Sequence, residues 1–176
     1  LEEEMRRVLP FVQAAVQFGV PISVDTYKAQ VMQAVLDAGA DIINDVWALR
    51  QPGAQSVVAN HPHCGVVLMH MHKTPQDMQQ TPMQGDAVAQ VQNFLAQQTQ
   101  ALLALGVERQ RIVWDYGIGF GKTVAQNFAL LAQQAALPRP RFPLLAGSSR
   151  QRSLAPVTTR SVEIRLAPSV AAAAFA

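Results

Sequence analysis

The chain has 176 residues, of which 49% are hydrophobic and only 15% are charged, so it can bury a core and lacks the composition of a disordered protein. Its net charge is +2 and no block of five or six Lys or Arg occurs, a pattern that excludes a strongly basic nucleic-acid or membrane-surface protein. We therefore expect neither nucleic acid nor membrane as a partner, and the small positive excess suits an anionic small substrate.

The first half of the chain alternates helix-like and strand-like segments. Apolar residues recur at helical spacing over residues 5–18, and Gly19 stops this helix. A β-branched run predicts a strand over 22–26, and a helical stripe follows over 31–36. The alternation continues with a strand, a weak helix and another strand, over residues 41–46, 55–60 and 65–72.

The second half repeats this alternation. A long helix is predicted from Asp86, with Gly106 past its end, and an apolar strand follows over 112–115. A glycine-rich turn comes directly after that strand. A helix, a strand and a final Ala-rich helix are then predicted over residues 125–136, 143–147 and 169–176.

This alternation predicts βαβ units and therefore a parallel sheet of the α/β class. Periodicity does not distinguish a doubly wound sheet from a barrel. A (β/α)₈ TIM barrel has eight strand–helix units and typically about 250 residues, whereas five units are predicted here. If the fold is a barrel, residues 1–176 form a single partial TIM-barrel domain, with about three units outside this sequence.

Several features indicate a cytoplasmic protein. No apolar run reaches the roughly 18 residues that a membrane-spanning helix needs. The opening residues 1–4 are acidic, unlike the basic start of a secretory signal. Cys64 is the single cysteine, which excludes an internal disulfide and fits a reducing compartment.

Polar side chains end three of the predicted strands: Asp25, Asn44 and Asp115. In parallel α/β folds the ligand site lies beyond the carboxyl ends of the strands, so we expect these three residues to share one site. A carboxylate accepts two parallel hydrogen bonds from an amidine-like edge, and an amide both donates and accepts. Such a trio suits a flat ligand with several N–H donors. For any one residue alone, the alternative is an N-cap of the next helix.

The turn over residues 115–123, DYGIGFGKT, is the densest signal in the chain. It is neither a Walker A loop, because Tyr116 stands where glycine is required, nor G-x-G-x-x-G, because Lys122 takes the place of the third glycine. Its glycines allow a close backbone approach to a ligand. Phe120 is a candidate for stacking on an aromatic ring, and Lys122 for contacting an anion or a carboxylate. The alternative is a tight turn with a solvated lysine.

Two further groups are candidates for ligand contacts. Arginines flanked by hydroxyls follow the strand over 143–147, in the segment 147–153 (GSSRQRS), and suit phosphate or carboxylate capture; a loop that exposes arginines to water is the alternative. His and Cys residues also gather at positions 61, 63, 64, 70 and 72, but their spacing matches no structural zinc pattern. We therefore expect no metal site there, and favour a histidine that hydrogen-bonds to neighbours inside a barrel mouth.

The motifs together resemble those of the dihydropteroate synthase family, in the family's order and over nearly the whole chain. The matching stretches are ISVDT at 22–26, IINDV at 42–46, LMHM at 68–71, D-x-GIGFGK at 115–122, G-x-SR at 147–150 and RLAPSVAAAA at 165–174.

The resemblance implies a (β/α)₈ barrel that condenses 7,8-dihydropterin-CH₂-pyrophosphate with p-aminobenzoate, giving dihydropteroate and pyrophosphate for folate synthesis. It implies Mg²⁺, whose ligands would lie outside this chain, a homodimer joined through helices such as the closing one, and a sulfonamide target. Asp25, Asn44 and Asp115 would line the pterin pocket, with Asp25 and Asp115 in catalytic roles. The implied substrate-binding set continues with Phe120, Lys122, Gly147, Ser149, Arg150 and Gln151.

Two positions depart from the family pattern. Tyr116 follows Asp115 where the family usually has proline, and Gln151 replaces a lysine that normally contacts the pterin. The opening strands and the last strand of the family are also absent from this sequence, so we expect the polypeptide by itself to be inactive or incomplete. Two alternatives stay open: a related barrel that transfers a methyl group from methyltetrahydrofolate to a corrinoid, and a degenerate barrel that binds pterin without turnover.

Overall fold

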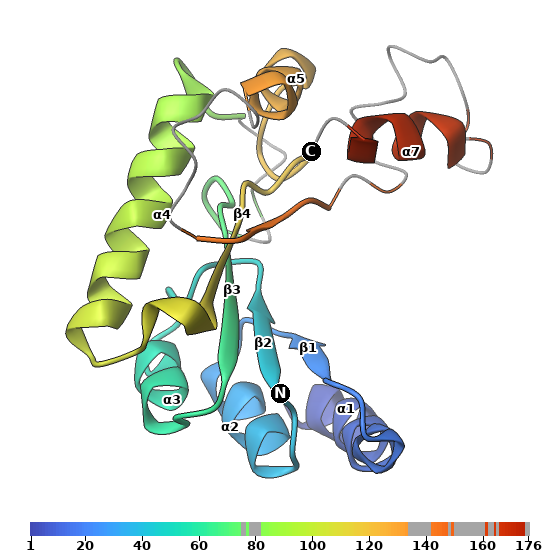
Figure 1. Cartoon of the computed structure of the whole chain (residues 1–176), viewed down its shortest axis with the longest axis vertical. Helices are drawn as coiled ribbons and strands as arrows, with labels where there is room; N and C mark the ends of the chain where they lie inside the picture. Colours follow the sequence, from blue (N-terminus) through green and yellow to red (C-terminus); the bar gives the residue numbers. More distant parts are fainter. Residues whose placement is uncertain are drawn as a thin grey trace.

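The computed structural model describes residues 1–74, 77, 82–133, 142–147, 149, 161, 164 and 166–174. Within these residues, short parallel strands alternate with helices along the chain (Figure 1). The strands are β1 (Ser23–Asp25), β2 (Ile42–Asp45), β3 (Gly65–Met69), β4 (Ile112–Asp115) and β5 (Leu144–Leu145). The helices are α1 (Glu2–Ala15), α2 (Ala29–Asp37), α3 (Ala54–Asn60), α4 (Ala87–Ala104), α5 (Val124–Gln133) and α7 (Leu166–Ala174), with 3₁₀ turns η1 (Val16–Phe18) and η2 (Arg109–Arg111).

The five predicted strands and the helices between them are confirmed. The strand expected over 65–72 is shorter, because its partner β4 ends at Asp115 and the last paired residues are Met69 and Asp115. The His70 N–H still donates to the Asp115 carbonyl at 3.0 Å, but beyond this bond the chain after β4 leaves the sheet for the glycine-rich turn. Residues 134–136 of the predicted fifth helix, and 175–176 of the last, lie outside the described residues.

The strand order distinguishes a barrel from a doubly wound sheet. All five strands are parallel and each pairs with its sequence neighbour, in the order β1-β2-β3-β4-β5. A doubly wound sheet reverses its order at a switch point, whereas a barrel continues in one direction with its helices outside. Neighbouring helices also contact each other, α1 with α2, α2 with α3, and α4 with α5. The fold is therefore a five-stranded part of a TIM barrel.

The strand register divides the side chains between two faces. In parallel strands, residues paired at one position point to the same side, and neighbours along a strand alternate. Val24, Ile43, Val66 and Ile112 are paired in turn across four strands, are buried, and join the hydrophobic core with the helices. Asp25 and Asn44, one residue further along, therefore lie on the opposite face.

The helices carry the complementary apolar stripe. On α2, Val31, Met32 and Val35 are fully buried. The long helix α4 begins after Asp86, whose side chain accepts hydrogen bonds from two backbone N–H groups of the first turn. Helix-on-sheet burial of this kind fixes the strand ends, and with them the candidate site, on a rigid base. In the described part of the chain, no helix combines the length and hydrophobicity needed to cross a bilayer.

Candidate active site at the strand ends

Asp25 and Asn44 lie side by side at the carboxyl ends of β1 and β2. They are direct partners in the sheet register, and Asn44 Nδ2 lies 3.5 Å from Asp25 Oδ2 in a long hydrogen bond. Desolvation at the strand ends raises the pKa of Asp25. The following helices α2 and α3 begin after Lys28 and Gly53, without a side-chain cap. Neither Asp25 nor Asn44 therefore caps a helix.

Asp115 reaches the same face of the sheet from β4. Asn44 pairs with Val67, and Asp115 pairs with Met69, so Asp115 stands two residues further along and two strands away. With a strand spacing near 4.8 Å and a rise of about 3.3 Å per residue, this separates the Asn44 and Asp115 Cα atoms by roughly 12 Å on a flat sheet. On the concave side of a barrel, side chains point toward a common axis, so their ends lie closer together than their Cα atoms. The structure therefore brings the three predicted strand-end residues to one face.

The Asp115 carboxylate is largely buried, with 8% of the residue exposed. Its Oδ1 accepts a hydrogen bond of 2.7 Å from the backbone N–H of Gly117. A Cβ placed on Gly147 would lie 3.8 Å from Oδ2, so Gly147 lies next to this oxygen without a side chain. Burial raises the pKa of Asp115, while the Gly117 N–H and the charge of Lys122 oppose this rise.

The glycine-rich turn is fixed by its own backbone and by α5. Gly117, Gly119 and Gly121 all have positive φ, between 64° and 88°. The side chain of Asn127, on α5, accepts a hydrogen bond of 2.8 Å from the Gly119 N–H. Phe120, predicted to stack on a ring, is half-buried within this turn. The turn therefore has a fixed conformation beside Asp115. Ring stacking by Phe120 stays a prediction.

The Lys122 side chain does not extend into solvent, because only 7% of the residue is exposed. Its ammonium donates to three backbone carbonyls, those of Gly117 at 2.8 Å, His70 at 3.1 Å and Phe120 at 3.2 Å. Burial lowers the pKa of Lys122 to about 7, and the negative charge of Asp115 opposes the fall. The solvated-lysine alternative is wrong, and a direct substrate contact by Lys122 stays a prediction.

The predicted loop after β5 is described only in part. Gly147 lies beside Asp115, and Ser149 is exposed. Arg150 and Gln151 lie outside the described residues. Their predicted substrate contacts therefore stay predictions.

Two charged residues next to the site were not singled out from the sequence. Asp45 follows Asn44, is fully buried on the helix side, and accepts hydrogen bonds of 2.7 Å from the N–H groups of Trp47 and Leu49. Burial raises the pKa of Asp45 to about 6. Arg50 donates to the carbonyls of Trp47 and Met71, which ties the loop after β2 to the loop after β3. The side-chain alternation along β2, which points Asp45 toward the helices, is the one sequence signal for its burial.

The His and Cys residues at positions 61–72 have separate surroundings. His70 is buried directly after β3, with its ring edge-on to that of Phe94 at a centroid distance of 5.0 Å, and its Nδ1 has no hydrogen-bond partner among the described residues. His61 instead pairs with Asp37, with 3.2 Å between Nε2 and Oδ1. Cys64 is buried as a free thiol. Among the described residues, no three His, Cys, Asp or Glu side chains gather as metal ligands would.

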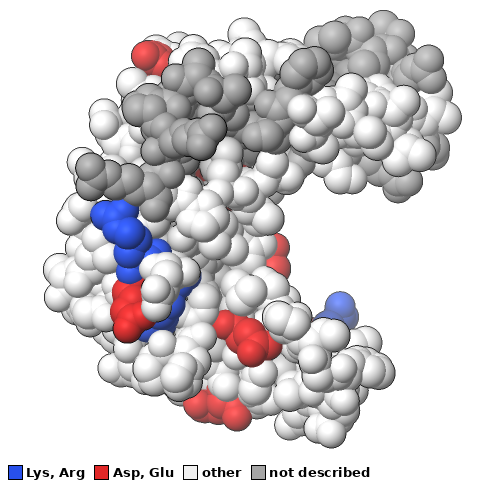
Figure 2. Space-filling view, in the orientation of Figure 1, with Lys and Arg blue, Asp and Glu red and all other residues white. Residues whose placement is uncertain are grey.

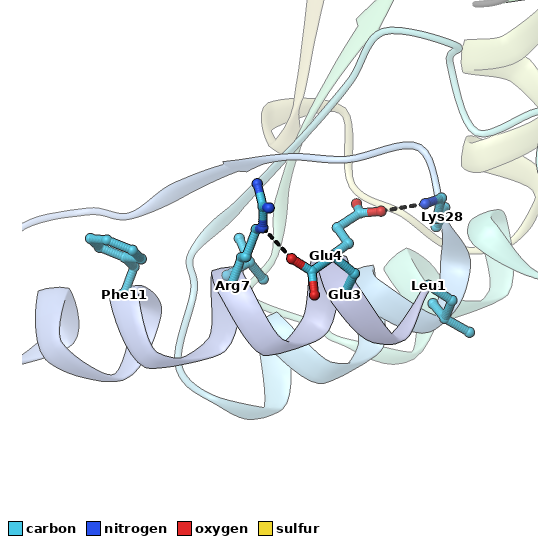
Figure 3. A pocket seen from close by; sticks show the side chains of 7 residues that line it. Leu1, Glu3, Glu4, Arg7, Phe11 and Lys28 are labelled. Carbon is cyan, nitrogen blue, oxygen red and sulfur yellow. Dashed lines mark hydrogen bonds and ion pairs between the residues drawn. The ribbon is translucent and has the colours of Figure 1, made fainter.

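The hollowed side of the molecule is visible in Figure 2, where acidic side chains (red) reach the inner wall. A separate cavity of about 650 Å³ lies along α1, lined by Glu4, Arg7, Phe11 and Lys28 among others (Figure 3). There Lys28 is paired with Glu4, and Arg7 with Glu3. That cavity holds none of Asp25, Asn44 or Asp115, so we place the candidate site at the strand ends.

The geometry therefore defines a class of protein: a parallel barrel with two carboxylates and an amide on its inner face, suited to a flat heterocycle rich in N–H donors. The family model described as pterin binding enzyme matches residues 1–176, and the chain belongs to this family.

Relatives and solved structures agree with this membership. The chain is 37% identical over 177 residues to the dihydropteroate synthase of Escherichia coli K12, a match that covers 100% of this chain and 62% of the relative. It is 46% identical to a Burkholderia cenocepacia dihydropteroate synthase solved with 7,8-dihydropteroate, with a TM-score of 0.91 over 99% of this chain and 65% of that one. A Xanthomonas albilineans dihydropteroate synthase with 4-aminobenzoic acid matches at 45% identity and a TM-score of 0.89, over 99% of this chain and 62% of that one. The chain thus spans about three fifths of the length of its curated relatives.

Proposed function

We propose that the protein containing this chain is a dihydropteroate synthase, a transferase that joins 7,8-dihydropterin-CH₂-pyrophosphate to p-aminobenzoate in folate synthesis. The observation that carries this proposal is the placement of Asp25, Asn44 and Asp115 on one face at the strand ends, beside the glycine-rich turn. The relative solved with 7,8-dihydropteroate supports the same substrate class.

In this proposal Asp115 recognises the 2-amino and N3 edge of the pterin. Its Oδ1 is fixed by Gly117, and Gly147 places no side chain against its Oδ2. A carboxylate oxygen has two acceptor sites, so Oδ1 can accept a second hydrogen bond from a ligand. At the other end of the bicyclic ring, Asp25 would accept hydrogen bonds from ligand N–H groups, and Asn44 would both donate and accept.

The proposed reaction is dissociative. The bond between the pterin methylene and the pyrophosphate oxygen breaks, and its electron pair leaves with pyrophosphate. The amino nitrogen of p-aminobenzoate then forms the new bond to the cationic methylene and releases a proton. The carboxylates of Asp25 and Asp115 favour this charge distribution, because negative groups fixed in place stabilise a cation that develops beside them.

Mg²⁺, a homodimer and a cytoplasmic location belong to the same proposal. The described residues hold no cluster of metal ligands, and no step is assigned to the ion. Tyr116, which stands where the family usually has proline, is 1% exposed and packs into the core. Tyr116 thus fills space behind the site, which is compatible with catalysis.

Product analysis tests the proposal. The full-length protein that contains this chain should convert the pterin pyrophosphate and p-aminobenzoate into dihydropteroate and an equal amount of pyrophosphate, and should not transfer a methyl group from methyltetrahydrofolate to a corrinoid. The Asp115→Asn variant should lose the condensation. Pterin affinity without any turnover would overturn the enzymatic proposal in favour of a binding protein.

A further inference from the structure

Lys122 is a buried cation that the proposed reaction leaves without a role. Its ammonium has three N–H donors, and the carbonyls of Gly117, His70 and Phe120 accept all three. Two of these carbonyls belong to the glycine-rich turn, and the third follows β3. The ammonium therefore ties the ends of two neighbouring strands together.

One of those contacts leads directly to Asp115. The Gly117 carbonyl accepts from Lys122 at 2.8 Å, and the Gly117 N–H donates to Asp115 Oδ1 at 2.7 Å. The glycine is thus held from one side by a cation and holds a carboxylate on the other. Hydrogen bonds in such a chain polarise one another, and a charged donor is worth roughly twice a neutral one.

We propose that Lys122 is a positioning residue for Asp115: it fixes the Gly117 peptide that orients Oδ1, and it places an ammonium group near the buried carboxylate. This inference rests on the proposed function, because it gives Lys122 an effect on the reaction through the Asp115 contact to the pterin. In this inference Lys122 acts through the Gly117 peptide, whereas the family resemblance implies a direct substrate contact.

Among the described residues, Asp115 faces the charge of Lys122 and the Gly117 N–H. Lys122 in turn faces Asp115, and its charge adds to burial in lowering the pKa of His70 and His72. Removing the ammonium leaves the Gly117 N–H as the one described group that opposes the effect of burial on Asp115. The pKa of Asp115 should then rise.

The test is carboxyl-carbon NMR of the chain across pH, with the Asp115 signal assigned by its loss in Asp115→Asn. Lys122→Met should raise the pKa of Asp115 by about one unit or more, the size that a neighbouring charge produces. Lys122→Arg keeps the charge but presents a planar fork to three converging carbonyls, so it should give an intermediate value. The control Lys28→Met removes a lysine paired with Glu4 and should leave Asp115 unchanged. An unchanged Asp115 in folded Lys122→Met overturns the inference.

The wild-type chain offers a second measurement, which decides the matter if Lys122→Met does not fold. The amide signal of Gly117 should follow both the titration of Asp115 and that of Lys122, the latter identified from the lysine Cε signal. A Gly117 amide that ignores the Lys122 titration overturns the inference. Neither measurement needs a ligand, so failure to bind pterin would count against the proposed function and leave this inference standing.

Discussion

Gly117 lies against the end of β3, where a Cβ at this position would overlap the carbonyl oxygen of His70 and approach Met69 Cγ to 3.2 Å. Its φ of +64° belongs to the left-handed region, which side chains disfavour. The carbonyl that the Cβ would strike is one of the acceptors of Lys122. The glycine, the buried lysine and the strand end are therefore a single fitted unit.

Gly117→Ala should destabilise the fold severely. We expect a loss of about 3 to 5 kcal/mol, since left-handed backbone costs an alanine about 1 to 2 kcal/mol and the overlap adds a similar or larger amount. Urea denaturation measures it. Gly19→Ala is the matched control, because Gly19 has φ +65° with nothing within 4 Å of its Cβ position, and it should cost only the backbone part. Equal losses for the two variants would contradict the packing described here.

Asp45→Asn should destabilise the loop after β2. Asp45 uses one oxygen for Trp47 N–H and the other for Leu49 N–H, and an amide group keeps only one acceptor oxygen. An unpaired buried N–H costs about 1 to 3 kcal/mol, which a urea titration at neutral pH would detect. Asp86→Asn is the control, because Asp86 serves both of its backbone donors with a single oxygen. A loss in Asp86→Asn as large as that in Asp45→Asn would show that the second oxygen of Asp45 is not needed.

His70 should make the fold sensitive to acid. Burial lowers its pKa to about 3, below the value near 6.5 expected in the unfolded chain, so its contribution to stability is complete above pH 6.5 and is lost as the pH falls toward 3. His70→Gln should lose less unfolding free energy between pH 7 and pH 5 than the wild type does. Asp45→Asn should change in the opposite sense, because the pKa of Asp45 is raised to about 6. A His70→Gln variant as acid-sensitive as the wild type would contradict a buried neutral imidazole.

Local sequence pattern was sufficient for the elements but not for their arrangement. Apolar runs such as 112–115 and stripes such as 31–36 predict the strands and helices that the structure has, because they depend on residues close in sequence. The barrel order depends on which strands pair, and periodicity carries no such information. The register of Asp25 with Asn44 is likewise a property of the assembled sheet.

The part of the candidate site that lies at the strand ends could be predicted from the sequence. The part that is held by backbone groups far away in the sequence could not. Asp25, Asn44 and Asp115 could be proposed because parallel strands end on one side. The environment of Lys122 could not be predicted, because one of the carbonyls that accept its hydrogen bonds belongs to His70, 52 residues away in the sequence. The bridge from Arg50 to Met71 also follows only from tertiary packing, whereas the alternation of side chains along β2 is a sequence signal for the burial of Asp45.

The most direct test of the central claim is calorimetric titration of a pterin analogue into the wild-type protein and into Asp115→Asn. We expect the substitution to weaken binding by about 10- to 100-fold, because a carboxamide cannot accept two parallel N–H bonds and leaves one ligand donor unpaired. Asp41→Asn is the control, since Asp41 contacts Ile22 at the opposite end of the strands. Undiminished affinity in Asp115→Asn would contradict recognition of the pterin edge by this carboxylate.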